Sequence, residues 1–126
     1  MIKELFHVGI AVEDVDEAIA FFQDKLGAEL VQKVDMPWIK QISAVMKLGD
    51  FNLEVMQGTA EDSVISKFIK EKGEGLHHIS VKVDGWQKGL EEFENKGMRI
   101  IGKNPAMKTA FIHPKSCKGI LVEVTE

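Results

Sequence analysis

The sequence predicts an α+β fold whose two halves repeat one pattern of a strand, a helix and further strands. The first observation is that an offset of 71 residues brings His7 onto His78 and aligns the apolar residues around them. The second is that a helical segment with its own start and stop signals follows each of these two strands. The third is that the remaining apolar runs are short and rich in β-branched residues, which is typical of strands. Two unrelated βα units could share such periodicity, but the matched histidines favour a duplication.

The repeat also covers residues on either side of the histidines. At the offset of 71, apolar residues meet apolar residues: Val8 with Ile79, Ile10 with Val81, Ile19 with Leu90 and Phe22 with Phe93. Towards the end of each half, segment 53–55 matches segment 122–124 at an offset of 69, which aligns Glu54 with Glu123. Each half therefore offers one histidine on its first strand and one glutamate on its last.

The first helix is delimited at both ends. Segment 14–27 begins with Asp14 in the N-cap position and has Glu17 three residues later, which is the pattern of a capping box. It ends at Gly27, a residue that suits the left-handed conformation found just after many helices. The apolar residues between these ends follow helical spacing, so they are expected to face the core.

Two further helices are expected. Segment 84–97, which ends at Gly97, is the counterpart of the first helix in the second half. Segment 62–73 predicts a linking helix that starts at either Asp62 or Ser63. Besides the strands that carry the two histidines, strands are expected around 28–34, 39–48, 51–57, 98–101, 108–113 and 119–125. The turn at 48–50 suits a hairpin between two of these strands.

The 126 residues predict one domain, because this length is ordinary for a single hydrophobic core. Within it we expect module one over about 1–58, the linking helix over about 62–73 and module two over about 75–126. The formal net charge of −4 and the pI near 5.6 argue against nucleic-acid and membrane-surface partners. The lone Cys117 excludes an internal disulfide, and no leader-like apolar run follows the N-terminus, so a cytoplasmic location is expected.

The matched residues His7, Glu54, His78 and Glu123 are candidate metal ligands. Strand alternation places the two histidines away from the helix-packing face, and each glutamate interrupts an apolar strand. Either glutamate alone could simply face solvent on an edge strand, but the repeated pairing with a histidine favours a shared metal site. A buried carboxylate is costly unless it is paired or bound to a metal. Two imidazoles and two carboxylates suit Co²⁺, Ni²⁺, Zn²⁺ or Mn²⁺, and on a six-coordinate ion they leave two positions open.

Two other histidines are weighed separately. His77 precedes His78 on the apolar face of the same strand, so it is expected to be a core or rim residue. His113, at a strand end before a turn, could line a cleft or hydrogen-bond its own turn.

The segments "DSVISKF" (62–68), "GEGLHHI" (73–79) and "HPKSCKGILVE" (113–123) carry a resemblance to a known family. They resemble the vicinal oxygen chelate superfamily, which contains the glyoxalases, bleomycin resistance proteins and extradiol dioxygenases, and within it the methylmalonyl-CoA epimerases. The likeness covers nearly the whole chain. It implies two tandem βαβββ modules that form a cupped mixed sheet around a metal site, usually in a homodimer. It also implies His7, Glu54, His78 and Glu123 as the metal ligands.

The activity implied by this resemblance is metal-dependent epimerisation of methylmalonyl-CoA by α-proton abstraction through a metal-stabilised enolate. One divalent ion per subunit is expected, with Co²⁺ favoured over Ni²⁺, Zn²⁺, Mn²⁺ or Mg²⁺. Glu123 is the first candidate for the base, and Glu54 is its counterpart on the opposite side of the substrate. His113, Lys115 and Lys118 are candidate contacts to the acyl-CoA.

Two alternatives stay open at this point. A glyoxalase I-type lactoylglutathione lyase uses the same kind of ligand set, but arginines usually bind the glutathione carboxylates, and Arg99 is the only arginine here. A metal-free small-molecule-binding module of the same fold would not need four intact ligands.

Overall fold

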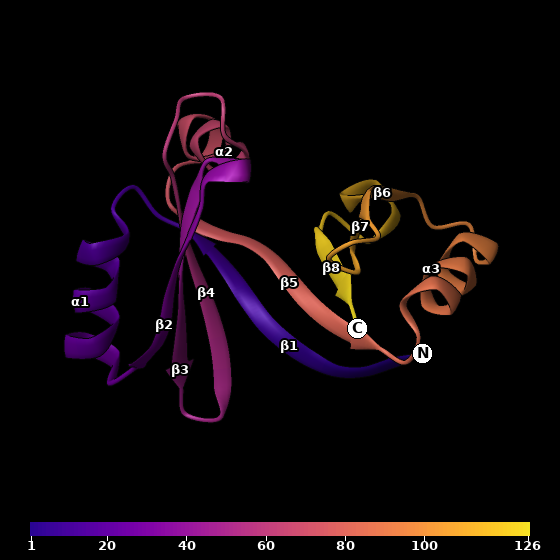
Figure 1. Ribbon diagram of the computed structural model, residues 1–126, viewed down its shortest axis with the longest axis horizontal. Helices are drawn as coiled ribbons and strands as arrows, with labels where there is room; N and C mark the ends of the chain where they lie inside the picture. The colour runs from indigo at the N-terminus through magenta and orange to yellow at the C-terminus, as the bar shows by residue number, and fades with distance from the viewer. The chain divides into compact units, whose positions relative to one another are not determined.

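The computed structural model describes residues 1–126, which form eight strands and three α-helices (Figure 1). The first half consists of β1 (Ile2–Ala11), α1 (Val15–Leu26), β2 (Glu29–Met36), β3 (Gln41–Leu48) and β4 (Phe51–Gly58). Helix α2 (Val64–Lys72) follows, and the second half consists of β5 (Gly75–Val83), α3 (Trp86–Asn95), β6 (Ile100–Asn104), β7 (Thr109–Ile112) and β8 (Val122–Thr125). Two short 3-10 helices, η1 (Pro37–Ile39) and η2 (Pro114–Ser116), lie in the connections. The predicted α+β class is confirmed.

The two halves have the same strand connectivity. The hydrogen-bonded strand order is β2-β3-β4-β1-β5-β8-β7-β6, a mixed sheet of eight strands. The first and last strands of each half, β1 with β4 and β5 with β8, pair in parallel. The other pairs within each half are antiparallel. Each half therefore has the βαβββ motif.

The repeat extends to the register of the parallel pairs. In the first half Gly9 lies opposite Glu54, and in the second half Ser80 lies opposite Glu123. Gly9 and Ser80 are 71 residues apart, and Glu54 and Glu123 are 69 residues apart, which are the offsets that align the two halves of the sequence. The repeated glutamates therefore occupy equivalent positions in the two βαβββ motifs.

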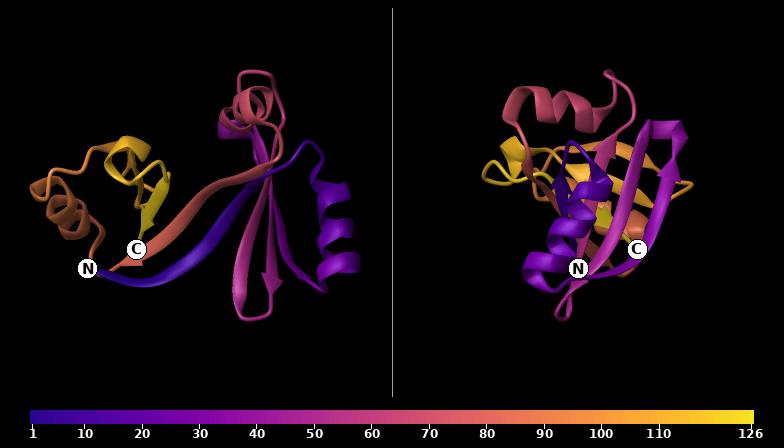
Figure 2. Two further views of the ribbon diagram at one scale, coloured as in Figure 1. Left: turned by 180° about the vertical axis from the view of Figure 1, so that it is seen from behind. Right: turned by 90° about the vertical axis from the view of Figure 1, so that its left-hand side faces the viewer.

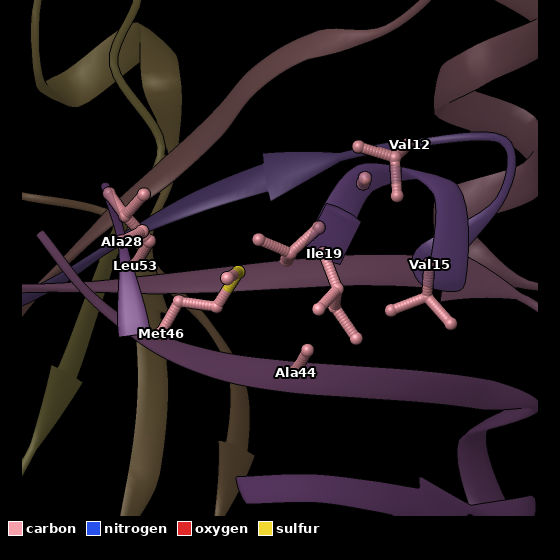
Figure 3. Close-up of a cluster of buried hydrophobic side chains, with 9 residues drawn as sticks. Val12, Val15, Ile19, Ala28, Ala44, Met46 and Leu53 are labelled. Carbon is pink, nitrogen blue, oxygen red and sulfur yellow. The ribbon is translucent and has the colours of Figure 1, made fainter. Parts of the chain in front are cut away.

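Contacts divide the chain into two compact units, Val8–His77 and Met1–His7 with His78–Glu126. In the first unit, α1 runs beside strands β2, β3 and β4 (Figures 1 and 2). Side chains from α1 and these strands bury one another in an apolar cluster, much of which is labelled in Figure 3. It comprises Val12, Val15, Ala18, Ile19, Ala28, Ala44, Met46, Leu53 and Val55. The predicted single domain and module boundaries stay predictions.

The second unit has its own apolar cluster, built from the matching elements. Helix α3 contributes Trp86, Leu90 and Phe93, which pack against strand residues of β5, β7 and β8. The strand residues are Val81, Val83, Ala110, Ile112, Val122 and Val124. No helix in the chain combines the length and the apolar character that a membrane span needs.

The predicted helix ends are largely confirmed. Asp14 Oδ1 accepts a hydrogen bond from the Glu17 backbone N–H at 3.0 Å, and Gly27 adopts the left-handed conformation with φ 70°. For α2 the structure decides between the two proposed starts. The N-cap is Ser63, whose hydroxyl accepts from the Ser66 backbone N–H, whereas Asp62 forms an ion pair with Lys40.

Three strands begin two or three residues later than expected, each because a local turn intervenes. β3 begins at Gln41 because η1 and the left-handed Lys40 (φ 54°) precede it. β6 begins at Ile100, after Met98 has closed the end of α3 by donating to the Phe93 carbonyl. β8 begins at Val122 because Lys118 and Gly119, both with positive φ, keep the chain in a turn. The hairpin predicted at 48–50 joins β3 to β4.

Gly89 allows α3 to lie close to β5. A Cβ at this position would meet Cγ2 of Val83 at 2.9 Å and its Cβ at 3.1 Å, and Val83 is fully buried and stiff. We expect Gly89→Ala to lower the free energy of unfolding by about 1–2 kcal/mol, since overpacking outweighs the gain in helix propensity. Urea denaturation measures the change. Lys88→Ala, at an exposed position of the same helix, is the control and should stay within about 0.5 kcal/mol of the wild type; equal stability of all three proteins would contradict the prediction.

Candidate metal centre

The side chains of His7, on β1, and His78, on β5, point their ring nitrogens toward each other. Both side chains are buried, with 7% and 6% of their surface exposed. The two Nε2 atoms lie 3.0 Å apart, and the rings meet edge to face. When both rings are neutral, a hydrogen bond at this distance requires one ring to donate its N–H to the lone pair of the other. The strands therefore bring two imidazole nitrogens to one point.

Glu123 on β8 adds a carboxylate to the same point. Its Oε1 lies 3.7 Å from His7 Nε2, and one ligand atom from each of His7, His78 and Glu123 lies within 4.8 Å of the other two. The hydroxyl of Ser80, which lies opposite Glu123 in the β5–β8 register, donates to this Oε1 at 2.7 Å. The carboxylate is therefore held by a neighbour that is itself completely buried.

Burial controls the protonation of two of these groups. Desolvation lowers the pKa of His7 to about 4, so its imidazole is neutral at physiological pH. Desolvation raises the pKa of the Glu123 carboxyl, and the hydrogen bond from Ser80 opposes this rise. His7 thus offers a lone pair, and Glu123 holds a proton more readily than an exposed glutamate does.

The donor types, and two separations among the three side chains, suit a divalent transition-metal ion. Metal–nitrogen and metal–oxygen bonds of about 2.1 Å limit the separation of two ligand atoms on one ion to about 4.2 Å. The two separations given above, 3.0 and 3.7 Å, lie within this limit. Neutral imidazoles with a carboxylate are also the donors that Co²⁺, Ni²⁺ and Zn²⁺ accept.

The fourth predicted ligand, Glu54, lies on β4 in the Val8–His77 unit. Its side chain is half-buried, and its strand neighbours are Gly9 on β1 and Val45 on β3. The gathered group consists of His7, His78 and Glu123, and the ligand role of Glu54 stays a prediction.

His113 forms a hydrogen bond within its own turn, one of the two alternatives that the sequence left open. Its Nδ1 accepts from the Lys115 backbone N–H at 3.0 Å, which caps η2, and its backbone N–H donates to the Arg99 carbonyl. Lys118 follows in the same connection, with a left-handed backbone. The role of His113, Lys115 and Lys118 as substrate contacts stays a prediction.

The neighbouring histidines of β5 have different surroundings. The ring of His77 packs edge to face on Phe68 of α2 at 4.9 Å, in agreement with the expectation of a core or rim residue. Burial, assisted by the charge of Lys72, lowers the pKa of His77. His78 instead faces His7, as strand alternation requires of adjacent residues.

Two residues around the gathered group were not assigned a role from the sequence. Ser80 lies on the His78 face of β5, and its hydroxyl donates to Glu123. Phe111 lies opposite Glu123 on β7, and its ring is edge-on to His78 at 6.2 Å. Alternation along β5 could have identified Ser80, whereas Phe111 depends on the β7–β8 register, which the sequence does not specify.

Comparison with known proteins gives consistent results. A family model described as the glyoxalase/bleomycin resistance protein/dioxygenase superfamily matches residues 6–112. The human mitochondrial methylmalonyl-CoA epimerase is 32% identical over 128 residues, which cover 97% of this chain and 73% of the human protein. An ethylmalonyl-CoA/methylmalonyl-CoA epimerase of Cereibacter sphaeroides is 31% identical over 133 residues, covering 100% of this chain and 99% of that protein.

A solved structure agrees over almost the whole length. A Streptomyces coelicolor methylmalonyl-CoA epimerase in complex with 2-nitronate-propionyl-CoA superposes with a TM-score of 0.87. It is 27% identical, and the match covers 98% of this chain and 96% of that one. The resemblance inferred from the sequence motifs is thereby confirmed. The chain belongs to the glyoxalase/bleomycin resistance protein/dioxygenase superfamily.

Proposed function

We propose that this protein is an isomerase that epimerises methylmalonyl-CoA, interconverting its R and S forms with the help of one divalent metal ion. The observation that carries the proposal is the convergence of His7, His78 and Glu123 on one point. The full-length similarity to epimerases that act on methylmalonyl-CoA supports the choice of substrate. The chemistry supports it too, because a carboxylate and a thioester carbonyl on one carbon make the intervening α-proton removable.

We assign His7, His78 and Glu123 as ligands and Glu54 as the fourth. Support for Glu54 comes from the repeat, since Glu54 occupies in β4 the register position that Glu123 occupies in β8. When bound, a divalent ion supplies a Lewis acid that stabilises negative charge on the substrate oxygens. Among the candidates we favour Co²⁺ over Ni²⁺, Zn²⁺, Mn²⁺ and Mg²⁺.

Glu123 is the proposed base. A carboxylate that loosens from the ion can reach the substrate carbon and take its proton, and the Ser80 hydrogen bond keeps Glu123 beside the two histidines. Epimerisation also needs a proton donor on the other side of the substrate carbon, and we assign this role to Glu54. The positive charges of Lys115 and Lys118, with His113, are proposed to contact the acyl-CoA.

We also propose a homodimer in the cytoplasm. The dimer follows from the resemblance to the methylmalonyl-CoA epimerases. The cytoplasmic location follows from the single cysteine, because a disulfide-free chain suits a reducing compartment.

A variant that lacks one of the proposed ligands should bind the metal more weakly. His78→Ala removes a direct ligand and should weaken Co²⁺ binding by roughly 100-fold or more, exceeding the 10–100-fold typical of losing a supporting group. Isothermal titration of the metal-stripped proteins measures the affinity. The neighbouring His77→Gln variant is the matched control and should bind Co²⁺ as the wild type does. Equal affinity of His78→Ala and wild type would remove His78 from the ligand set.

A variant that lacks the proposed base should abstract the α-proton more slowly. Metal-loaded protein incubated with methylmalonyl-CoA in D₂O should exchange the α-proton, and Glu123→Gln should slow this exchange by about 10²–10⁴-fold. Proton NMR follows the loss of the α-proton signal. A Glu123→Gln protein that kept both its metal and full exchange would exclude Glu123 as the base. Failure of the wild type to exchange, with turnover of a glutathione hemithioacetal instead, would replace this proposal with the lactoylglutathione lyase.

Acid should destabilise the metal-free protein through His7. The unfolded chain protonates His7 near its ordinary pKa of 6.5, whereas the folded chain does so only near 4, so folding opposes proton binding between these values. Stability from this source is complete above pH 6.5 and falls as the pH drops towards 4, by about 3 kcal/mol at most. His7→Gln lacks this loss, so the difference in unfolding free energy between the two proteins should shift in favour of the variant. Urea titrations in chelator at pH 7 and pH 4 test this, and parallel behaviour would contradict it.

A further inference from the structure

The two repeated glutamates differ in what lies opposite them. Glu54 faces Gly9 in the β1–β4 register, and Gly9 has no side chain to donate a hydroxyl from that position. Glu123 faces Ser80 in the β5–β8 register and receives a 2.7 Å hydrogen bond from its hydroxyl. The second half of the repeat thus contains a donor that the first half lacks at the equivalent place.

The Ser80 hydroxyl acts on the carboxylate oxygen nearest to the histidines. It donates to Oε1, and this oxygen is the one that lies 3.7 Å from His7 Nε2. Ser80 has 0% of its surface exposed, so water does not compete for the hydroxyl. A serine side chain is also short, so a hydroxyl held by the backbone of β5 restricts where the carboxylate can lie.

We propose that Ser80 is a positioning residue, which holds the Glu123 carboxylate towards His7 and His78 and thereby raises the affinity of this group for a divalent ion. This inference rests on the proposed metal-dependent function, and it concerns a residue that would not itself touch the ion. Groups that orient metal ligands by hydrogen bonding typically change metal affinity by 10–100-fold when they are removed.

Four variants at two buried serines separate this role from packing. Ser80→Ala removes the hydroxyl. Ser80→Thr and Ser80→Val have the same shape as each other and differ only in the presence of the hydroxyl. Ser43→Ala is the control for the loss of a buried hydroxyl as such, because Ser43 is 2% exposed and its hydroxyl accepts from Gln41.

The experiment is a Co²⁺ titration of the metal-stripped full-length proteins, followed by both isothermal calorimetry and the visible absorption of bound Co²⁺. Folding of each variant is first checked by circular dichroism. We expect Ser80→Ala and Ser80→Val to bind Co²⁺ about 10–100-fold more weakly than the wild type, with an altered absorption spectrum. Ser80→Thr should remain within about threefold of the wild type, and Ser43→Ala should match it.

The outcomes distinguish this inference from the proposed function. Equal affinity and equal spectra for Ser80→Thr and Ser80→Val would overturn the positioning role, and this comparison decides the question even if Ser80→Ala does not fold. Wild-type protein that binds no Co²⁺ would overturn the metal-dependent function and, with it, the role of Ser80. Tight binding by the wild type with unchanged binding by Ser80→Ala would overturn the role of Ser80 alone.

Discussion

The candidate metal centre depends on the parallel pairing of β5 with β8. This pairing sets Ser80 opposite Glu123, and it places Val122 and Val124, the neighbours of Glu123, in the apolar cluster under α3. A slip of one residue would turn Glu123 into that cluster and turn a valine towards the histidines. Because burying a charge among apolar side chains is costly, the observed register is favoured over the slipped one. The observed register also keeps Glu123 beside His7 and His78.

Burial has opposite effects on the groups that it brings together. It favours the neutral form of each, so it removes the proton from His7 and makes Glu123 hold one more tightly. The first effect suits the proposed metal binding, since a ligand needs a neutral imidazole. The hydrogen bond from Ser80 opposes the rise in the pKa of Glu123, because it stabilises the charged carboxylate.

Duplication explains why the architecture is symmetric while the chemistry is not. The two halves share strand order, parallel closing pairs and the register of their glutamates. The two halves nevertheless carry different residues at equivalent positions, as the contrast between Gly9 and Ser80 shows. A repeated fold can in this way supply two similar carboxylates and adjust one without disturbing the other.

The sequence by itself determined the α+β class, the repeat and the ends of α1, because these depend on local periodicity, on capping residues close in the chain and on the similarity of the two halves. It did not decide between Asp62 and Ser63 at the start of α2, nor show that His113 hydrogen-bonds its own turn, because each depends on which hydrogen bond forms in the folded chain. It also left Ser80 and Phe111 without a role. Only the tertiary structure shows the contacts of Ser80 and Phe111, because they arise from the register between strands, and register is set by the packing of side chains that are distant in the sequence.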